Sequence, residues 1–98
     1  MKTKTTSTAE LKKRIIPVLK SHGIFRASLF GSAARGELRK GSDIDLLIDT
    51  KGKLDLFAIV GLKQALEHQL SRPVDLVEYK ALKPTLRAKV LAEQVQML

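Results

Sequence analysis

Two aspartates separated by one apolar residue are the part of this sequence best suited to chemistry. Asp43 and Asp45 flank Ile44, and apolar residues continue to Ile48. In a β-strand, side chains two positions apart leave the same face with Cα atoms about 6.8 Å apart, so the carboxylates would lie together. Such hard oxygen donors suit Mg²⁺, and two such ions could flank a displacement at phosphorus. The alternative is a solvated strand end whose charges prevent edge pairing.

A glycine and a serine at the end of an earlier apolar run could bind a phosphate. Residues 24–30 are predicted to form a strand that ends at Gly31, where the missing side chain allows a sharp turn and close backbone approach. Ser32 could cap a short helix over residues 32–36, and the N–H groups at its start suit an anion. An ordinary strand-to-helix turn with a serine cap is the alternative. A Walker loop is excluded because no Gly-Lys-Ser/Thr follows.

A third aspartate lies in a short apolar segment farther along the chain. Asp75 falls within residues 73–78, which are predicted to form a buried strand. An aspartate in such a segment needs a reason, because Asp is seldom fully buried without a partner. If this strand pairs with the strand of Asp43 and Asp45, Asp75 could be a metal ligand or the base for an attacking hydroxyl. Otherwise it is a strand-end residue that faces solvent.

Taken together, these widely spaced motifs resemble the DNA polymerase beta-like nucleotidyltransferase superfamily. Within it, the chain looks like the minimal nucleotidyltransferases, or MNT domain proteins. The similarity covers nearly the whole chain, although Ala33 stands where many relatives carry a bulkier or basic residue. The matching segments are Leu29-Phe-Gly-Ser, Ala34-Arg-Gly-Glu, Ser42-Asp-Ile-Asp-Leu and Val74-Asp-Leu, together with the predicted helices.

The resemblance implies a role for each part of the motif. Two Mg²⁺ ions are expected, and three aspartates would hold them and act in catalysis. These are Asp43, Asp45 and Asp75. Gly31 and Ser32 would bind the triphosphate of ATP.

Three further polar residues lie near the motif. Arg35 is a candidate for nucleotide binding, although a surface hydrogen bond that braces the loop explains it as well. Ser42 could contact the nucleotide at the edge of the site, or it could cap the loop. Asp49 shares the strand parity of the aspartate pair but lies at the far end of the strand, and is predicted to be solvated.

The resemblance also implies a reaction and a partner. The chain would transfer AMP from ATP to a tyrosine hydroxyl of a HEPN-type toxin and release pyrophosphate, and so act as an antitoxin. A chain of this size has room for one core only, so the acceptor is expected on that partner protein. The alternative is a non-catalytic antitoxin or nucleotide-binding module that neutralises its partner by forming a complex.

The hydrophobic pattern predicts the elements that position these residues. Their order indicates an α/β (α+β) fold, a small mixed sheet of three to four strands flanked by helices, as in polymerase beta-like nucleotidyltransferases. Pro17 is expected to kink the first helix, and residues 94–98 could form a short edge strand. The predicted elements are a helix from the capping box Ser7–Glu10 to about Gly23, strand 24–30, helix 32–36, strand 43–49, helix 54–71, strand 73–78 and helix 84–95. The buried faces of the last two helices are predicted to carry Leu56, Ile59, Leu62, Leu66 and Leu70, and Leu86, Val90 and Leu91.

Composition limits the class of protein. The 98 residues include no cysteine, so a disulfide framework and a cysteine zinc site are excluded. The length predicts one domain, residues 1–98, with residues 1–6 as a disordered tail. No apolar run approaches the about 20 residues of a membrane span, and the N-terminus lacks the apolar segment of a signal peptide. A cytoplasmic protein with no membrane contact is expected.

The net charge of +8 predicts attraction to acidic partners, including nucleotides and nucleic acid. The basic residues are scattered along the chain, and aromatic residues do not alternate with them. Stacking on single-stranded nucleic acid is therefore poorly supported. Direct nucleic-acid binding is possible but not favoured, and part of the positive field could serve to attract ATP.

Overall fold

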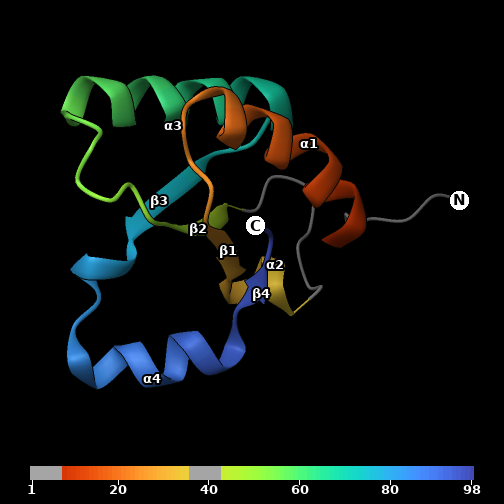
Figure 1. Cartoon of the computed structure of the whole chain (residues 1–98). Coiled ribbons are helices and arrows are strands. Elements are labelled where there is room, and N and C mark those ends of the chain that lie inside the picture. The colour runs from red at the N-terminus through yellow and green to blue at the C-terminus, as the bar shows by residue number, and fades with distance from the viewer. Residues whose placement is uncertain (1–7, 36–42) are drawn as a thin grey trace, which may run out of the picture.

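A sheet with helices on both sides occupies residues 8–35 and 43–98, the part of the chain described by the computed structural model (Figure 1). The predicted tail lies outside these residues. The elements are α1 (Thr8–Ser21), β1 (Ala27–Phe30), α2 (Gly31–Ala34), β2 (Ile44–Ile48), α3 (Leu56–Leu70), β3 (Val74–Glu78), the 3-10 turn η1 (Tyr79–Ala81), α4 (Pro84–Glu93) and β4 (Val95–Gln96).

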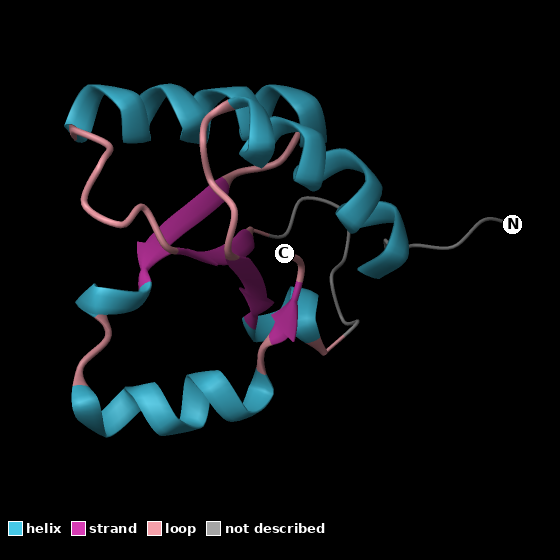
Figure 2. Cartoon of the chain, in the orientation of Figure 1, coloured by secondary structure: helices cyan, strands magenta, loops and turns pink. Residues whose placement is uncertain are grey.

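The sheet is mixed, and its strand order is β3-β2-β1-β4. β2 runs parallel to β3, whereas β1 pairs antiparallel with both β2 and β4. α1 and α3 cover one face of this sheet, and α4 lies on the opposite side (Figure 2). The predicted α/β class and the edge strand near the C-terminus are therefore confirmed.

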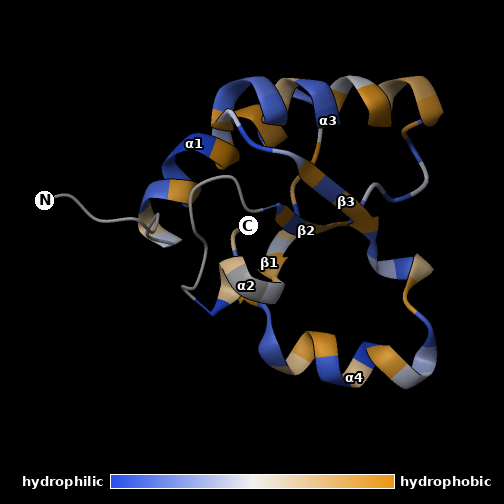
Figure 3. Ribbon diagram, turned by 180° about the vertical axis from the view of Figure 1, so that it is seen from behind, coloured by the Kyte–Doolittle hydropathy of each residue, from blue (hydrophilic) through white to orange (hydrophobic). Residues whose placement is uncertain are grey.

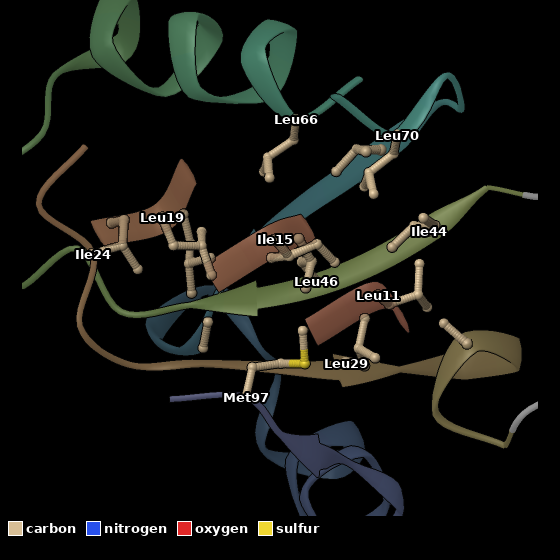
Figure 4. Close-up of a cluster of buried hydrophobic side chains, with 14 of the residues drawn as sticks. Leu11, Ile15, Leu19, Ile24, Leu29, Ile44, Leu46, Leu66, Leu70 and Met97 are labelled. Carbon is tan, nitrogen blue, oxygen red and sulfur yellow. The ribbon is translucent and has the colours of Figure 1, made fainter. Parts of the chain in front are cut away.

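The core lies between the sheet and the pair α1 and α3. Leu11, Ile15 and Leu19 repeat at helical spacing and present one buried stripe of α1. Ile44 and Leu46 alternate along β2 and point toward that stripe. Figure 4 shows side chains from α1, α3, β1 and β2 meeting in this layer. All five of these residues are no more than 1% exposed, so this face of the sheet is sealed.

Capping explains where α3 begins and ends. Asp55 has extended backbone angles, and its side chain accepts a hydrogen bond of 2.8 Å from the backbone N–H of Ala58. This N-cap starts the helix two residues later than predicted. At the other end Ser71 adopts φ 54°, a left-handed conformation that stops the helix. Pro17 lies inside α1, and the helix continues past it to Ser21.

The predicted buried faces of α3 and α4 are only partly correct. Leu62, Leu66 and Leu70 of α3 are buried, but Leu56 at its start is 72% exposed. No residue of α4 is buried, and Leu86 is 51% exposed. The reason is that α4 lies across the sheet from α1 and α3, outside the apolar layer that those two helices form with it (Figure 3). Apolar spacing predicted the helix correctly, but it could not say whether another element would cover it.

None of the helices in the described ranges is long and apolar enough to cross a membrane.

Candidate active site

Strand pairing brings the predicted aspartates together at one edge of the face opposite α1 and α3. Asp45 lies directly opposite Asp75 in the parallel pair β2 and β3, and opposite Phe30 in the antiparallel pair β1 and β2. Residues that face each other across a sheet share a face. Because Ile44 belongs to the core, the side chains of this row point away from α1 and α3. Asp43 precedes β2 by one residue, has the same parity as Asp45, and is exposed.

Burial and the neighbouring carboxylates act together on Asp45. Its pKa is raised above the ordinary value of 3.8, first by partial burial, then by the charge of Asp75 and then by that of Asp43. The charges of Asp75 and Asp43 both act on Asp45, so Asp45 lies within electrostatic range of each. Such an arrangement favours a cation or a proton between them.

A metal ion fits these donors by their chemistry and charge. The set offers only carboxylate oxygens, which Mg²⁺ prefers. In the described ranges, however, no group of three acidic, cysteine or histidine side chains is already arranged around a common metal position. Cation binding is therefore supported by the carboxylate charges that act on Asp45, and not by a set of ligands already arranged around one point.

Gly31 brings the backbone against the aspartate row. Its φ of +68° is in the left-handed region, and a Cβ atom at this position would lie 2.6 Å from Oδ2 of Asp45. The positive φ favours glycine, and a Cβ atom here would force the Asp45 carboxylate to move. The close neighbour of Gly31 is thus the carboxylate of Asp45, and the predicted approach of a phosphate to this backbone stays a prediction.

The start of α2 corrects one prediction. The helix begins at Gly31, and Phe30, with φ −142°, occupies the N-cap position without a side-chain hydrogen bond. Ser32 lies inside the first turn and is not the cap, because the positive φ of Gly31 turns the chain into the helix one residue earlier than expected. Its predicted contact with the triphosphate stays a prediction.

The remaining predicted residues lie in three different situations. Arg35 is exposed at the end of α2 and donates its backbone N–H to the carbonyl of Gly31 at 3.2 Å. Ser42 lies outside the described residues, so its role stays a prediction. Asp49 is half-buried at the far end of β2, where its Oδ1 accepts a hydrogen bond of 2.9 Å from the N–H of Lys51. Asp49 therefore holds a turn and does not join the aspartate row.

A second polar group on the same face was not predicted. Ser28, only 1% exposed, has its hydroxyl 2.6 Å from the hydroxyl of Tyr79. Tyr79 in turn donates to Oε1 of Gln94 at 3.3 Å, which connects the sheet to the end of α4. The guanidinium of Arg26 lies 4.6 Å from the centre of the Tyr79 ring. The sequence does place Ser28 inside the predicted strand 24–30. A buried hydroxyl needs a hydrogen-bond partner, so this serine could have pointed to a polar group here.

Comparison with known proteins identifies the family of this chain. Residues 13–98 match the family model described as polymerase beta nucleotidyltransferase. A protein of Methanocaldococcus jannaschii inferred to be a protein adenylyltransferase is 43% identical over 89 residues, 91% of this chain and 96% of that protein. The protein adenylyltransferase MntA of Thermococcus cleftensis is 34% identical over 91 residues, 93% of this chain and 85% of that protein.

Solved structures with a similar fold include a nucleotidyltransferase and toxin–antitoxin complexes. A chain inferred to be a minimal nucleotidyltransferase superposes with a TM-score of 0.79 at 36% identity, over 92% of this chain and 95% of that chain. A toxin–antitoxin complex with AMP-PNP gives a TM-score of 0.76 at 29% identity, over 89% and 72% of the two chains. A complex of tri-AMPylated Shewanella oneidensis HEPN toxin with MNT antitoxin gives 0.71 at 26% identity, over 93% and 71%.

Proposed function

Because the chain belongs to the polymerase beta nucleotidyltransferase family, we propose that it transfers AMP from ATP to a tyrosine hydroxyl of a HEPN-type toxin. It would thereby act as the antitoxin of that partner. Relatives named as protein adenylyltransferases support the reaction, and the solved complex with a tri-AMPylated HEPN toxin supports the class of acceptor. Such a partner and ATP as substrate are consistent with action in the cytoplasm.

The single observation that carries this proposal is the row made by Asp45 and Asp75, with Gly31 against it. Two carboxylates face each other across adjoining strands, and a glycine without room for a side chain brings backbone to the same point. The pKa of Asp45 is raised by partial burial and by the charges of Asp75 and Asp43, so a cation bound here would stabilise the row.

Each group has a proposed task in the reaction. Asp43, Asp45 and Asp75 would hold Mg²⁺, which neutralises phosphate charge when bound. Gly31 and Ser32 would receive the triphosphate, with Arg35 and Ser42 as further contacts. The acceptor oxygen then forms a bond to the α-phosphorus, and the bond from that phosphorus to the bridging oxygen breaks as pyrophosphate leaves. Asp75, exposed at the edge of the row, is suited to take the hydroxyl proton.

The experiment is transfer of label from α-labelled ATP to the partner toxin with Mg²⁺. The wild-type chain should label the toxin, and Asp43→Asn should reduce the rate by about 100-fold or more, since a charge that positions the phosphate is lost. Asp49→Asn is the matched control, because it has the same strand parity but only holds a turn. Its rate should stay within about threefold of wild type, as expected outside the reacting groups.

Two outcomes would count against the proposal. Equal labelling by wild type and Asp43→Asn would show that the aspartate row does not carry out the transfer. If Asp43→Asn neutralised the toxin at the same dose as wild type, the chain would act by complex formation and not by chemistry.

A further inference from the structure

The face that carries the aspartates continues along the strands to a basic end. The next row after Asp45 and Asp75 is formed by Ser28, Leu47 and Val77, which face one another across the three strands. Beyond them, the N–H of Asp49 donates to the carbonyl of Arg26, and Tyr79 follows β3. Four residues of strand at about 3.3 Å each place this end roughly 13 Å from the aspartates.

Two adjoining cavities open at this end, between η1 and α4. The smaller, about 170 Å³, is lined by Arg26, Tyr79, Leu82, Arg87 and Leu91. The larger, about 620 Å³, shares Leu82, Arg87 and Leu91 and adds Lys80, Pro84 and Ala88. The combined cavity therefore has cationic groups on its walls together with apolar surface.

Among the described residues, no carboxylate forms an ion pair with either arginine of this cavity. Arg26 stacks on the Tyr79 ring, and Nη2 of Arg87 lies 3.5 Å from the carbonyl oxygens of Tyr79 and Leu82. Within residues 8–35 and 43–98, neither guanidinium has a carboxylate within salt-bridge distance. Guanidinium groups bind phosphate through paired N–H donors, and two of them in one cavity attract an anion.

The distance of the cavity from the aspartates and its positive charge distinguish an ATP donor from an acceptor that is already adenylylated. An ATP donor carries its negative charge on the triphosphate, at the aspartate end, and presents an uncharged nucleoside beyond it. An acceptor that already carries an adenylyl group has a phosphodiester on the 5′ oxygen of the attached ribose, and hence negative charge across that ribose from its 2′ and 3′ hydroxyls. The apolar walls next to the cations match a nucleobase next to that phosphate.

We propose that this cavity binds the phosphodiester of an adenylyl group already attached to the acceptor, so that the enzyme can add another. The inference rests on the proposed function. A ribose hydroxyl of the attached group forms a bond to the α-phosphorus of a new ATP, and the bond to the bridging oxygen breaks. Pyrophosphate leaves with the electron pair, and the hydroxyl proton passes to a carboxylate of the aspartate row. The solved homologous complex with a tri-AMPylated toxin is consistent with repeated addition.

The test follows successive additions by intact mass of the toxin over time. Wild type should produce species with one, two and more adenylyl groups. Arg87→Ala should form the first species at a rate within about twofold of wild type but the later species about tenfold more slowly, as expected when a charge-assisted hydrogen bond is lost. Lys89→Ala is the matched control, since Lys89 is an exposed cation of α4 that lines neither cavity, and it should behave as wild type.

Each other outcome would overturn the inference in a recognisable way. If Arg87→Ala slowed the first addition as much as the later ones, the cavity would bind the donor or an acidic part of the toxin polypeptide. Unchanged later additions, or a wild type that stops at one group, would remove the subsite. If wild type added no group at all, the proposed function itself would fail, which is a different result from selective loss or retention of later additions.

A binding measurement tests the cavity without relying on transfer. The chain has one tyrosine, so Tyr79 gives a single set of ring resonances in NMR. Titration with the dinucleotide ApA, which carries one phosphodiester, should shift these resonances to saturation, whereas adenosine should not. Arg87→Ala should weaken the ApA response by about tenfold. Equal responses to ApA and adenosine, or no loss in the variant, would contradict the proposal.

Discussion

The two faces of one sheet are built for different purposes. The face toward α1 and α3 carries Ile44 and Leu46, both fully buried in a continuous apolar layer. The other face carries the Asp45 and Asp75 row and the Tyr79 group, with α4 beside it and no residue of α4 buried. Strand alternation assigns successive residues of β2 to these two environments.

The difference teaches that alternate residues of one strand can serve different purposes, one set stabilising the fold and the other forming the candidate active site. Burial of apolar side chains on one face supplies the free energy that holds the strands in register. The opposite face can then keep repelling carboxylates and uncovered cations, which contribute little to folding. Substitutions on the two faces should therefore change different measurements, and the following variants test that separation.

The largest effect on folding is expected on the core face. Leu66→Ala removes a fully buried side chain and should lower the free energy of unfolding by about 2–5 kcal/mol. Leu86→Ala on α4, where the side chain is 51% exposed, should change it by less than about 0.5 kcal/mol. Urea denaturation followed by circular dichroism compares the two. Similar losses would show that α4 is packed as tightly as α3.

Gly31→Ala should affect both folding and transfer. Alanine at a positive φ costs about 1–2 kcal/mol, and its Cβ would also collide with Oδ2 of Asp45. Gly23→Ala is the matched control, with φ +81° and no atom within 4 Å of the new Cβ. Both variants should lose stability, but only Gly31→Ala should slow AMP transfer, by about 100-fold if Asp45 moves by an ångström. Equal activities would mean that the contact with Asp45 is unimportant.

Tyr79→Phe should have a smaller effect on folding. It leaves the buried hydroxyl of Ser28 without its partner at 2.6 Å and should cost about 1 kcal/mol. Adding Ser28→Ala should recover part of that loss, because the unsatisfied hydroxyl is removed. A double-mutant cycle by thermal unfolding measures the interaction. Strictly additive losses would show that the two hydroxyls do not stabilise each other.

Asp45→Asn should have the smallest effect on the free energy of unfolding, and it should raise that energy where the other variants lower it. Folding raises the pKa of Asp45, so it favours the protonated form, and wild-type stability falls as the pH rises through that raised pKa. In EDTA at neutral pH the variant should be slightly more stable, by less than about 0.5 kcal/mol or about 2–4 °C in Tm, because solvent screens a partly exposed carboxylate. The gain should vanish below about pH 4, near the ordinary value of 3.8. A variant that is less stable at every pH would contradict the repulsion.

Sequence alone identified the parts of the fold that depend on local alternation. The parity of Asp43 and Asp45 and the apolar residues between them placed both carboxylates on one face before any pairing was known. The partner of Asp45 was predicted only conditionally, because register depends on contacts distant in sequence. The parallel pairing of β2 and β3 supplied that information by setting Asp75 opposite Asp45.

Other features depended on local geometry that residue types do not specify. Ile24 was assigned to the first strand, but its N–H donates to the carbonyl of Leu19 at 2.9 Å and ends α1 instead. Ser32 looked like a helix cap, but the backbone of Gly31 begins the helix earlier. The cluster around Tyr79 was missed because its members come from β1, η1 and the end of α4, and no sequence spacing connects them.

The position of β4 has a consequence for how the chain reaches this structure. β1, which leads into Gly31, has β4 as its neighbour on the side away from β2, and the N–H of Met97 donates to the carbonyl of Ala27 at 2.8 Å. Ala27 and Met97 are 70 residues apart in the sequence, so this contact closes a long loop and is slow to form. Until it forms, β1 is an open edge that can pair with another chain. Aggregation during refolding should therefore depend on the last residues more than their small contact area suggests.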